Sequence, residues 1–161
     1  PRSLPRCLLS RHAAAPGRNM NIVIQVYHPE RFAGVDALWR EVFPDDPPWN
    51  RAQFAIPAKL AVQPDLFLLA LQGDQVVGTV MGGYDGHRGW VYALAVKPDH
   101  RQNGIATELM AQLEARLRVL GCVKLNLQVR ADNTQVIKLY QRLGYSVEDR
   151  ISLGKRLTPP A

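Results

Sequence analysis

The loop Arg101-Gln102-Asn103-Gly104-Ile105-Ala106 has the residue types and spacing best suited to chemistry, because it opens the strongest helical pattern in the chain. The first backbone N–H groups of a helix have no intrahelical acceptor, and the helix dipole places about half a positive charge there. Gly104 would let a phosphate approach the backbone, and Ala106 is small for the same reason. Arg101 adds a permanent cation. These features are typical of a site for an anion such as a phosphate group.

Spacing alone leaves a second interpretation open, because a glycine at a helix start is more often simply a cap. The loop is not a P-loop, since no Gly-Lys-Ser/Thr is present. It is not a dinucleotide-binding fingerprint either, since it contains one glycine.

Composition narrows the class of protein. The 161 residues suit one domain of ordinary globular composition, and no apolar run is long enough to cross a bilayer. Cys7 and Cys122 form neither a metal-ligand spacing nor a disulfide framework, so a reduced, cytoplasmic location is expected. The formal net charge of +6 is concentrated at the N-terminal end, because four of the twenty basic residues and none of the acidic ones precede Met20. The remainder is nearly balanced and lacks a basic run with interleaved aromatic residues, which argues against a nucleic-acid-binding protein.

Residues 1–19 are predicted to be a disordered N-terminal extension, followed by one domain over residues 20–161. The extension contains prolines, arginines and small residues without an amphipathic period. Its apolar run is too short for a signal peptide. An organelle transit peptide is one alternative, and translated sequence upstream of a natural start at Met20 is the favoured one.

The remaining pattern predicts alternating strands and helices. Asn50 and Asn133 are expected to cap helices, Pro57 to kink or break the second helix, and Gly121 and Gly144 to end the last two. Strands are predicted at 22–27, 66–71, 75–84, 90–96, 123–129, 145–149 and 151–157, and helices at 30–43, 50–62, 105–120 and 133–143.

Two motifs in this framework resemble those of the GNAT superfamily of N-acetyltransferases. The stretch 94–106 resembles its acetyl-CoA motif, a strand followed by Arg/Gln-x-x-Gly-x-Gly/Ala. The segments 129–133 and 139–145 resemble its second motif, Asn-x6-Tyr-x3-Gly-Phe/Tyr. The likeness covers about residues 20–157 and extends to the YpeA-like group of bacterial acetyltransferases through 78–89 and 152–157. It implies a mixed α/β fold, with a mostly antiparallel, splayed sheet of about seven strands flanked by four helices.

The resemblance also implies acetyl-CoA as co-substrate and a set of residues that bind it. The strand carrying Leu94, Ala95 and Val96 would splay from its neighbour and pair with the pantetheine arm. The loop from Arg101 to Ala106 would bind the pyrophosphate, and Asn133 would contact the cofactor in addition to capping its helix.

Tyr140 is the catalytic residue that the resemblance implies. When an amine attacks the thioester, the thiolate of CoA must leave and take up a proton. A phenol has a pKa of about 10 and a thiol about 8.5, so a neutral tyrosine can donate a proton to the departing sulfur. The alternative is a core aromatic residue, because Val136, Tyr140 and Leu143 share one helical face.

The general base is harder to assign. Ribosomal-protein alanine acetyltransferases, which the chain resembles more weakly, have a glutamate where this chain has Gln128, and an amide cannot accept the proton. Asp85 and His87 are alternatives, although both lie in a glycine-flanked turn. The favoured interpretation is a chain of water molecules that ends on backbone carbonyl groups. A backbone N–H group of the splayed strand is expected to bind the oxyanion.

The acceptor is expected to be a primary amine of a small molecule or protein, bound over the first two helices and the final hairpin. Glu41, Asp45 and Asp46 could attract a cationic amine there, or simply form a solvated face. Trp49 could stack on a ligand, whereas Trp39 is expected to pack in the core. No metal, nucleic acid or membrane partner is expected, and the protein is predicted to be a monomer or homodimer. A non-catalytic acyl-CoA-binding sensor with the same fold is the alternative function.

Overall fold

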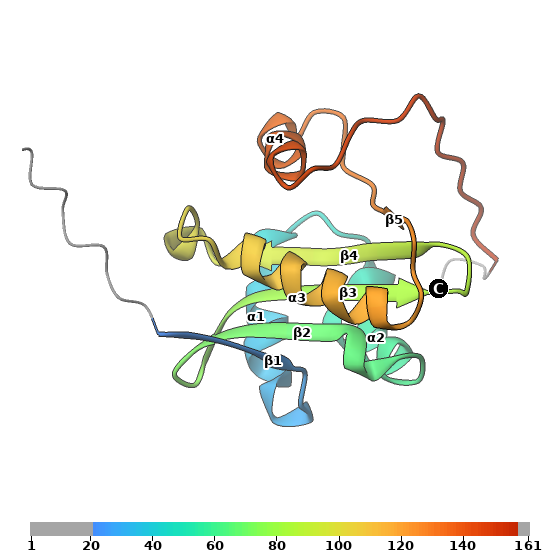
Figure 1. Ribbon diagram of the computed structural model, residues 1–161. Coiled ribbons are helices and arrows are strands. Elements are labelled where there is room, and N and C mark those ends of the chain that lie inside the picture. Colours follow the sequence, from blue (N-terminus) through green and yellow to red (C-terminus); the bar gives the residue numbers. More distant parts are fainter. Residues whose placement is uncertain (1–20, 158–161) are drawn as a thin grey trace, which may run out of the picture.

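The computed structural model describes residues 21–157, which form a mixed sheet with helices on both faces (Figure 1). The strand order is β1-β2-β3-β4-β5, and all neighbours are antiparallel except β4 and β5, which are parallel. The strands are β1 (Ile22–Val26), β2 (Phe67–Gln72), β3 (Gln75–Tyr84), β4 (Gly89–Val96) and β5 (Leu125–Asn126). The α-helices are α1 (Phe32–Val42), α2 (Ala52–Leu60), α3 (Ile105–Val119) and α4 (Thr134–Arg142). Residues 1–19, predicted to be a disordered extension, lie outside the described residues.

The sheet separates two apolar clusters. Helices α1 and α2 cover one face and α3 covers the other (Figure 1). Strand β2 contributes to both, with Phe67 and Leu69 on the α1–α2 side and Leu68 and Ala70 on the α3 side, all fully buried. A strand buried on both faces is a continuous apolar run, which is why the sequence predicts a strand here without alternation.

Helix α3 buries the stripe that its sequence predicts. Ile105, Leu109, Leu113 and Leu117 recur every four residues and are at most 3% exposed. The helix approaches β3 closely at Gly82, where a Cβ atom would lie 2.5 Å from Cδ1 of Leu113. Glycine at this position therefore sets the distance between α3 and the sheet.

The fold class and most of the predicted elements are confirmed. The architecture is a mixed α/β fold with a mostly antiparallel sheet and four α-helices among residues 21–157. Asn133 caps α4 through its side chain, and Gly121 and Gly144 follow α3 and α4 with φ of 86° and 91°. Trp39 is buried in the core, as expected.

The predicted number of strands is wrong, because residues 145–149 and 151–157 form no strand and the predicted strand 123–129 shortens to β5. A period-2 pattern forms a strand only where a neighbour supplies hydrogen bonds and a buried face. The side chains of Val147, Ile151 and Leu153 are at least 74% exposed, so they provide no such face. This C-terminal segment instead contacts the chain around β5 through polar side chains, Lys124 with Glu148 and Gln128 with Ser152.

The second helix also starts later than predicted. Pro47 and Pro48 lead into a 3-10 turn that includes Asn50, so α2 begins at Ala52 with Arg51 as its N-cap. The expected cap at Asn50 is therefore wrong. Pro57 lies inside α2, which continues to Leu60.

No helix among residues 21–157 combines the length and the apolar character needed to cross a membrane. These residues also lack a cluster of His, Cys, Asp and Glu side chains suited to a metal ion.

Candidate active site

One edge of β4 lacks a neighbouring strand over most of its length. Strand β5 pairs only with Gly89 and Trp90 of β4, and no other strand of the described residues lies on this side. Residues Leu94–Val96, predicted to bind the cofactor arm, therefore belong to a strand with an open edge. Unpaired backbone groups at such an edge can bind an extended ligand as an added strand.

Strand β4 also carries a bulge at Ala93, in the middle of this edge. The register with β3 shifts between Thr79, which pairs with Ala95, and Met81, which pairs with Tyr92. Ala93 has a φ of 48°, in the left-handed region that a residue with a Cβ atom seldom adopts. Bulges redirect a strand and are common beside ligand sites.

Two buried side chains support the bulge. The indole Nε1 of Trp39 donates a hydrogen bond to Oγ1 of Thr79 at 2.9 Å, and this hydroxyl donates to the carbonyl oxygen of Ala93 at 2.9 Å. Thr79 is fully buried and Trp39 is 5% exposed. Because the indole N–H, the Thr79 hydroxyl and the Ala93 carbonyl all have partners in this series, the orientation of the Ala93 carbonyl is fixed from the α1 side of the sheet.

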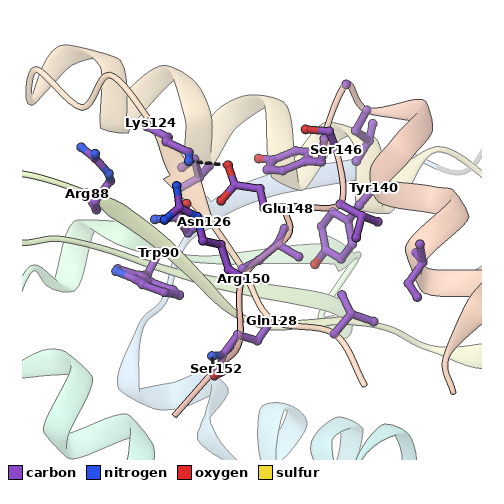
Figure 2. Close-up of a pocket in the computed structure, with 18 of the residues that line it drawn as sticks. Arg88, Trp90, Lys124, Asn126, Gln128, Tyr140, Ser146, Glu148, Arg150 and Ser152 are labelled. Atoms are coloured by element: carbon purple, nitrogen blue, oxygen red, sulfur yellow. Dashed lines mark hydrogen bonds and ion pairs between the residues drawn. The ribbon is translucent and has the colours of Figure 1, made fainter. Parts of the chain in front are cut away.

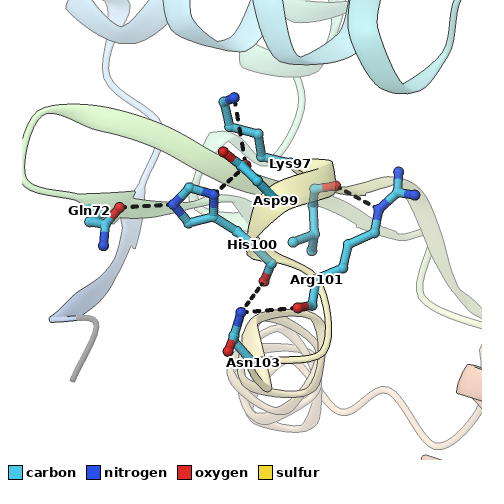
Figure 3. A network of polar contacts seen from close by, with 7 residues as sticks. Gln72, Lys97, Asp99, His100, Arg101 and Asn103 are labelled. Carbon is cyan, nitrogen blue, oxygen red and sulfur yellow. Dashed lines mark hydrogen bonds and ion pairs between the residues drawn. The ribbon is translucent and has the colours of Figure 1, made fainter. Parts of the chain in front are cut away.

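The loop between β4 and α3 is attached to the sheet through His100 (Figure 3). The imidazole is buried, and its Nδ1 atom donates to Oδ1 of Asp99 at 2.6 Å. Its Nε2 atom lies 2.8 Å from Oε1 of Gln72, the last residue of β2. The hydrogen bond from His100 lowers the pKa of the Asp99 carboxyl group, which remains ionised as an acceptor.

The same loop is shaped by Asn103 and Arg101. The amide nitrogen of Asn103 donates to the carbonyl oxygens of His100 and Arg101, at 3.1 and 3.0 Å. Nε of Arg101 donates to the carbonyl oxygen of Val96 at 3.2 Å. Arg101 and Asn103 are both exposed, and their hydrogen bonds hold the loop in one conformation (Figure 3).

The start of α3 offers free backbone N–H groups. Gln102 and Gly104 have positive φ values of 61° and 77°, and a Cβ atom at Gly104 would meet no atom within 4 Å. Among the described residues, the N–H groups of Ile105, Ala106 and Thr107 have no hydrogen-bond acceptor. An open, concave turn with unsatisfied N–H groups at a helix N-terminus has the chemistry needed to bind a pyrophosphate.

Helix α4 carries the other two predicted site residues. Oδ1 of Asn133 accepts the N–H group of Val136 at 3.3 Å, which confirms its role as a cap. The side chain is exposed, and its contact with a cofactor stays a prediction.

The phenol of Tyr140 is 7% exposed and lies edge-on to the ring of Tyr145, with 5.5 Å between centroids. The hydroxyl of Tyr145 donates to Glu114 of α3 at 2.8 Å, which ties the end of α4 to α3. The hydroxyl of Tyr140 has no protein partner among residues 21–157 and points into a cavity (Figure 2). Burial raises the pKa of Tyr140 to about 12, so its phenol remains protonated at neutral pH.

This cavity has a volume of about 1560 Å³ and lies between β5, α4 and the segment 144–153 (Figure 2). Gln128 also lines it, and its amide donates to the hydroxyl of Ser152. The loop 101–106 and residues 94–96 do not line the cavity. Leu94, Val96 and Ile105 share the apolar cluster of Tyr140 on the α3 face, whereas Ala95 packs on the opposite face.

Of the two candidate bases in the β3–β4 turn, Asp85 uses its side chain to hold the turn itself. Oδ1 of Asp85 accepts the backbone N–H groups of His87 and Arg88, both at 2.7 Å. These hydrogen bonds lower the pKa of Asp85, which makes it a weak proton acceptor.

The acidic side chains expected to attract an amine, Glu41, Asp45 and Asp46, lie outside the cavity beside Tyr140. Trp49 is half exposed, and the guanidinium of Arg156 lies 3.7 Å from the centroid of its ring. One face of Trp49 is therefore already covered by a cation.

Comparison with known proteins identifies the family. Residues 30–145 match the family model described as "Acetyltransferase (GNAT) family". An acetyltransferase of Pectobacterium atrosepticum is 47% identical over 136 residues, which cover 83% of this chain and 94% of the relative. One of Sodalis glossinidius is 47% identical over 137 residues, with the same coverage. The chain belongs to the GNAT acetyltransferase family. It is an acyltransferase, and the likeness seen in its sequence motifs is confirmed.

Solved structures share the GNAT fold at lower identity. Ard1 from Thermoplasma volcanium superposes with a TM-score of 0.71 at 20% identity, over 79% of this chain and 84% of that chain. The aminoglycoside N-acetyltransferase AAC(6')-Iy, solved in complex with CoA, gives 0.71 at 19% identity, over 90% of this chain and all of that one. These likenesses confirm the architecture of the sheet and its helices.

Several residues of this GNAT site escaped the sequence analysis. Nothing in the sequence singles out Ala93 as a bulge, because the residue is not a glycine and the bulge depends on contacts from α1. Thr79 reads as an ordinary strand residue, and His100 as a loop residue. The signal that distinguishes Thr79 and His100 is that they are buried polar side chains, and burial cannot be read from a single sequence.

Proposed function

We propose that this GNAT protein transfers the acetyl group of acetyl-CoA to a primary amine of a small molecule or protein, by direct attack in a ternary complex. The observation that supports this most is the open, bulged edge of β4, which leads into the free N–H groups at the start of α3. A strand edge suits an extended pantetheine arm, and a helix start suits the pyrophosphate that follows it. The bound CoA of the AAC(6')-Iy structure supports the choice of ligand class. The proposed catalytic domain spans residues 20–161.

In this proposal the backbone of Leu94, Ala95 and Val96 pairs with the arm. The loop Arg101–Ala106 binds the pyrophosphate through backbone N–H groups and the Arg101 cation. Asn133, at the start of α4, contacts the cofactor with the part of its amide that the cap leaves free. Acetyl-CoA supplies an activated thioester, and these residues orient it.

Tyr140 is the proposed general acid. The amine nitrogen bonds to the carbonyl carbon of the thioester and the carbon–sulfur bond breaks. The nitrogen loses one proton to water, and the departing sulfur receives one from the phenol. With a pKa of about 12 the phenol is protonated at neutral pH, so it carries the proton that the departing sulfur takes up.

Water is proposed as the base. Gln128 is an amide that donates to Ser152, and Asp85 is committed to its turn, so neither side chain is suited to accept the proton. A chain of water molecules ending on backbone carbonyl groups can take it, and a backbone N–H group of the bulged strand can bind the oxyanion.

The absence of a carboxylate at Gln128 also favours a second candidate, a sensor that binds acyl-CoA without turnover. The test is release of free CoA thiol in the presence of acetyl-CoA and a panel of amines. Turnover on any amine supports the transferase. Binding of acetyl-CoA by calorimetry, with no thiol released by any amine, supports the sensor.

A further inference from the structure

The end of α2 is anchored over the outer end of β3. Nζ of Lys59 donates to the carbonyl oxygen of Gly82 at 2.5 Å. The amide of Gln63 donates to the carbonyl oxygen of Tyr84 at 2.7 Å and accepts its N–H group at 2.9 Å. Strand β2 pairs with β3 only as far as Met81, so these two side chains satisfy backbone groups beyond the end of β2.

A second cavity of about 510 Å³ lies between this end of α2 and the β3–β4 hairpin. Val62, Trp90 and Tyr92 provide apolar and aromatic surface, with Val62 and Tyr92 more than half exposed. Among the described residues that line it, Lys59 is the only cation and Asp85 the only anion. Oδ1 of Asp85 already accepts two backbone N–H groups in an exposed turn.

The pocket adjoins the bulged edge of β4, which is proposed to hold the arm of the cofactor. Tyr92 directly precedes Ala93, the bulged residue on the open edge of β4. Trp90 and Tyr92 line the pocket together with residues of α2, which places it on the α1–α2 face of the sheet. An amine bound here would therefore approach the thioester from the face opposite α3.

The Lys59 ammonium is suited to bind an anion in this pocket. One of its three protons is donated to Gly82, and two remain for a ligand. The residue is partly buried, and desolvation by burial lowers the pKa of its ammonium group. A partly desolvated cation gains more from a carboxylate partner than a fully exposed one does.

We infer that this pocket binds the acceptor, and that the acceptor is a primary amine carrying a carboxylate beside an apolar or aromatic body, as in a free apolar amino acid. Lys59 binds the carboxylate, and the body packs on Val62 and Tyr92. The inference rests on the proposed acetyl transfer and names its acceptor. A polycationic amine, such as an aminoglycoside, is disfavoured because the positive charge of Lys59 repels it. The only acidic side chain among the described lining residues, Asp85, already accepts two backbone N–H groups of its own turn.

Thiol release from acetyl-CoA, with pairs of amines that differ in one group, tests the inference. Phenylalanine and leucine are compared with phenylalanine amide and leucine amide, which keep the amine and the body and lack the carboxylate. Neamine serves as the polycation. The variants are Lys59→Gln, which removes the charge but keeps an N–H donor, and Lys59→Arg, which keeps the charge. Calorimetric affinity for CoA is measured for each protein.

We expect the free amino acids to exceed their amides in kcat/KM by about tenfold or more, as for a hydrogen bond to a charged group. Lys59→Gln should remove that preference with unchanged CoA affinity, and Lys59→Arg should retain most of it. Equal or better use of the amides, or an equal loss for acids and amides in Lys59→Gln, would overturn the inference. So would binding of CoA with no turnover of either type of amine. If the unaltered protein did not bind CoA at all, the proposed function itself would be overturned.

Discussion

Nε2 of His100 lies 2.8 Å from Oε1 of Gln72, so a buried imidazole joins the loop before α3 to the end of a strand on the far side of β3. The other ring nitrogen donates to Asp99. Because His100 is followed directly by Arg101, this contact fixes the position from which the loop reaches the helix start (Figure 3).

Replacing His100 by Phe should therefore weaken cofactor binding rather than acceptor binding. The Phe ring fills the volume but can form a hydrogen bond with neither Asp99 nor Gln72. We expect KM for acetyl-CoA to rise by about fivefold or more, with KM for the amine unchanged. Steady-state kinetics with each substrate varied in turn checks this.

The matched control is His87→Phe, which changes an exposed histidine in the β3–β4 turn. Gln72→Leu combined with His100→Phe should cost less than the sum of the two single changes, because both remove the same contact. Additive effects, or equal changes in the two KM values, would refute a positioning role.

Tyr140→Phe tests the general acid. The variant retains the packing against Tyr145 and loses only the hydroxyl. We expect kcat to fall by roughly 10²–10⁴, the usual range for a lost general acid, with little change in the affinity for CoA. Thiol-release kinetics and calorimetry on the same preparation separate the two effects. Undiminished turnover in the variant would leave Tyr140 as a core aromatic residue.

Stability at alkaline pH should also depend on Tyr140. Its pKa is raised from 10 in the unfolded chain to about 12 in the folded protein. The contribution is fully present below pH 10 and is lost as the pH rises toward 12, because only the unfolded state releases the proton in that window. A pKa shift of this size corresponds to roughly 2–3 kcal/mol of the free energy of unfolding.

Urea unfolding of the unaltered protein and of Tyr140→Phe between pH 8 and pH 12 provides the measurement. The variant should lose less stability across that range than the unaltered protein does. Parallel pH profiles for the two proteins would contradict the assignment of the buried phenol. Tyr145 remains in both proteins, and the main causes of its raised pKa, burial and the hydrogen bond to Glu114, are common to both.

Gly82→Ala should destabilise the fold, whereas Gly83→Ala should not. A Cβ atom at Gly82 would lie 2.5 Å from Leu113, while the nearest atom to one at Gly83 is 3.9 Å away. The overpacking at Gly82 should cost about 1–3 kcal/mol of unfolding free energy. Urea denaturation of both variants decides the point, and equal stabilities would mean that α3 shifts without cost.

Local patterns predicted the parts of the molecule that depend on local physics. The four-residue repeat in α3, the cap at Asn133 and the turn at Asp85 each involve residues close in sequence, and all three are found as expected. The start of α3 after the loop 101–106 was predicted for the same reason, because a helix start is a property of a few adjacent residues, whereas phosphate binding there stays a prediction.

The features that depend on distant contacts could not be predicted. The bulge at Ala93 is supported by Trp39 and Thr79, which are separated by forty residues. The pocket beside Lys59 exists because α2 reaches Gly82 across the end of β2. The strands predicted at 145–149 and 151–157 are absent because pairing with a neighbouring strand, rather than alternation of residue types, decides whether a strand forms.

Calorimetric titration of CoA into the folded protein is the most direct test of the proposed pyrophosphate site at the start of α3. Binding should be measurable and salt-dependent. Arg101→Glu should weaken it by at least about tenfold, because the change places a negative charge beside the phosphates. Arg51→Glu, an exposed charge reversal at the start of α2, should leave it unchanged. An absence of CoA binding in the folded protein, or equal affinities for the two variants, would contradict the account.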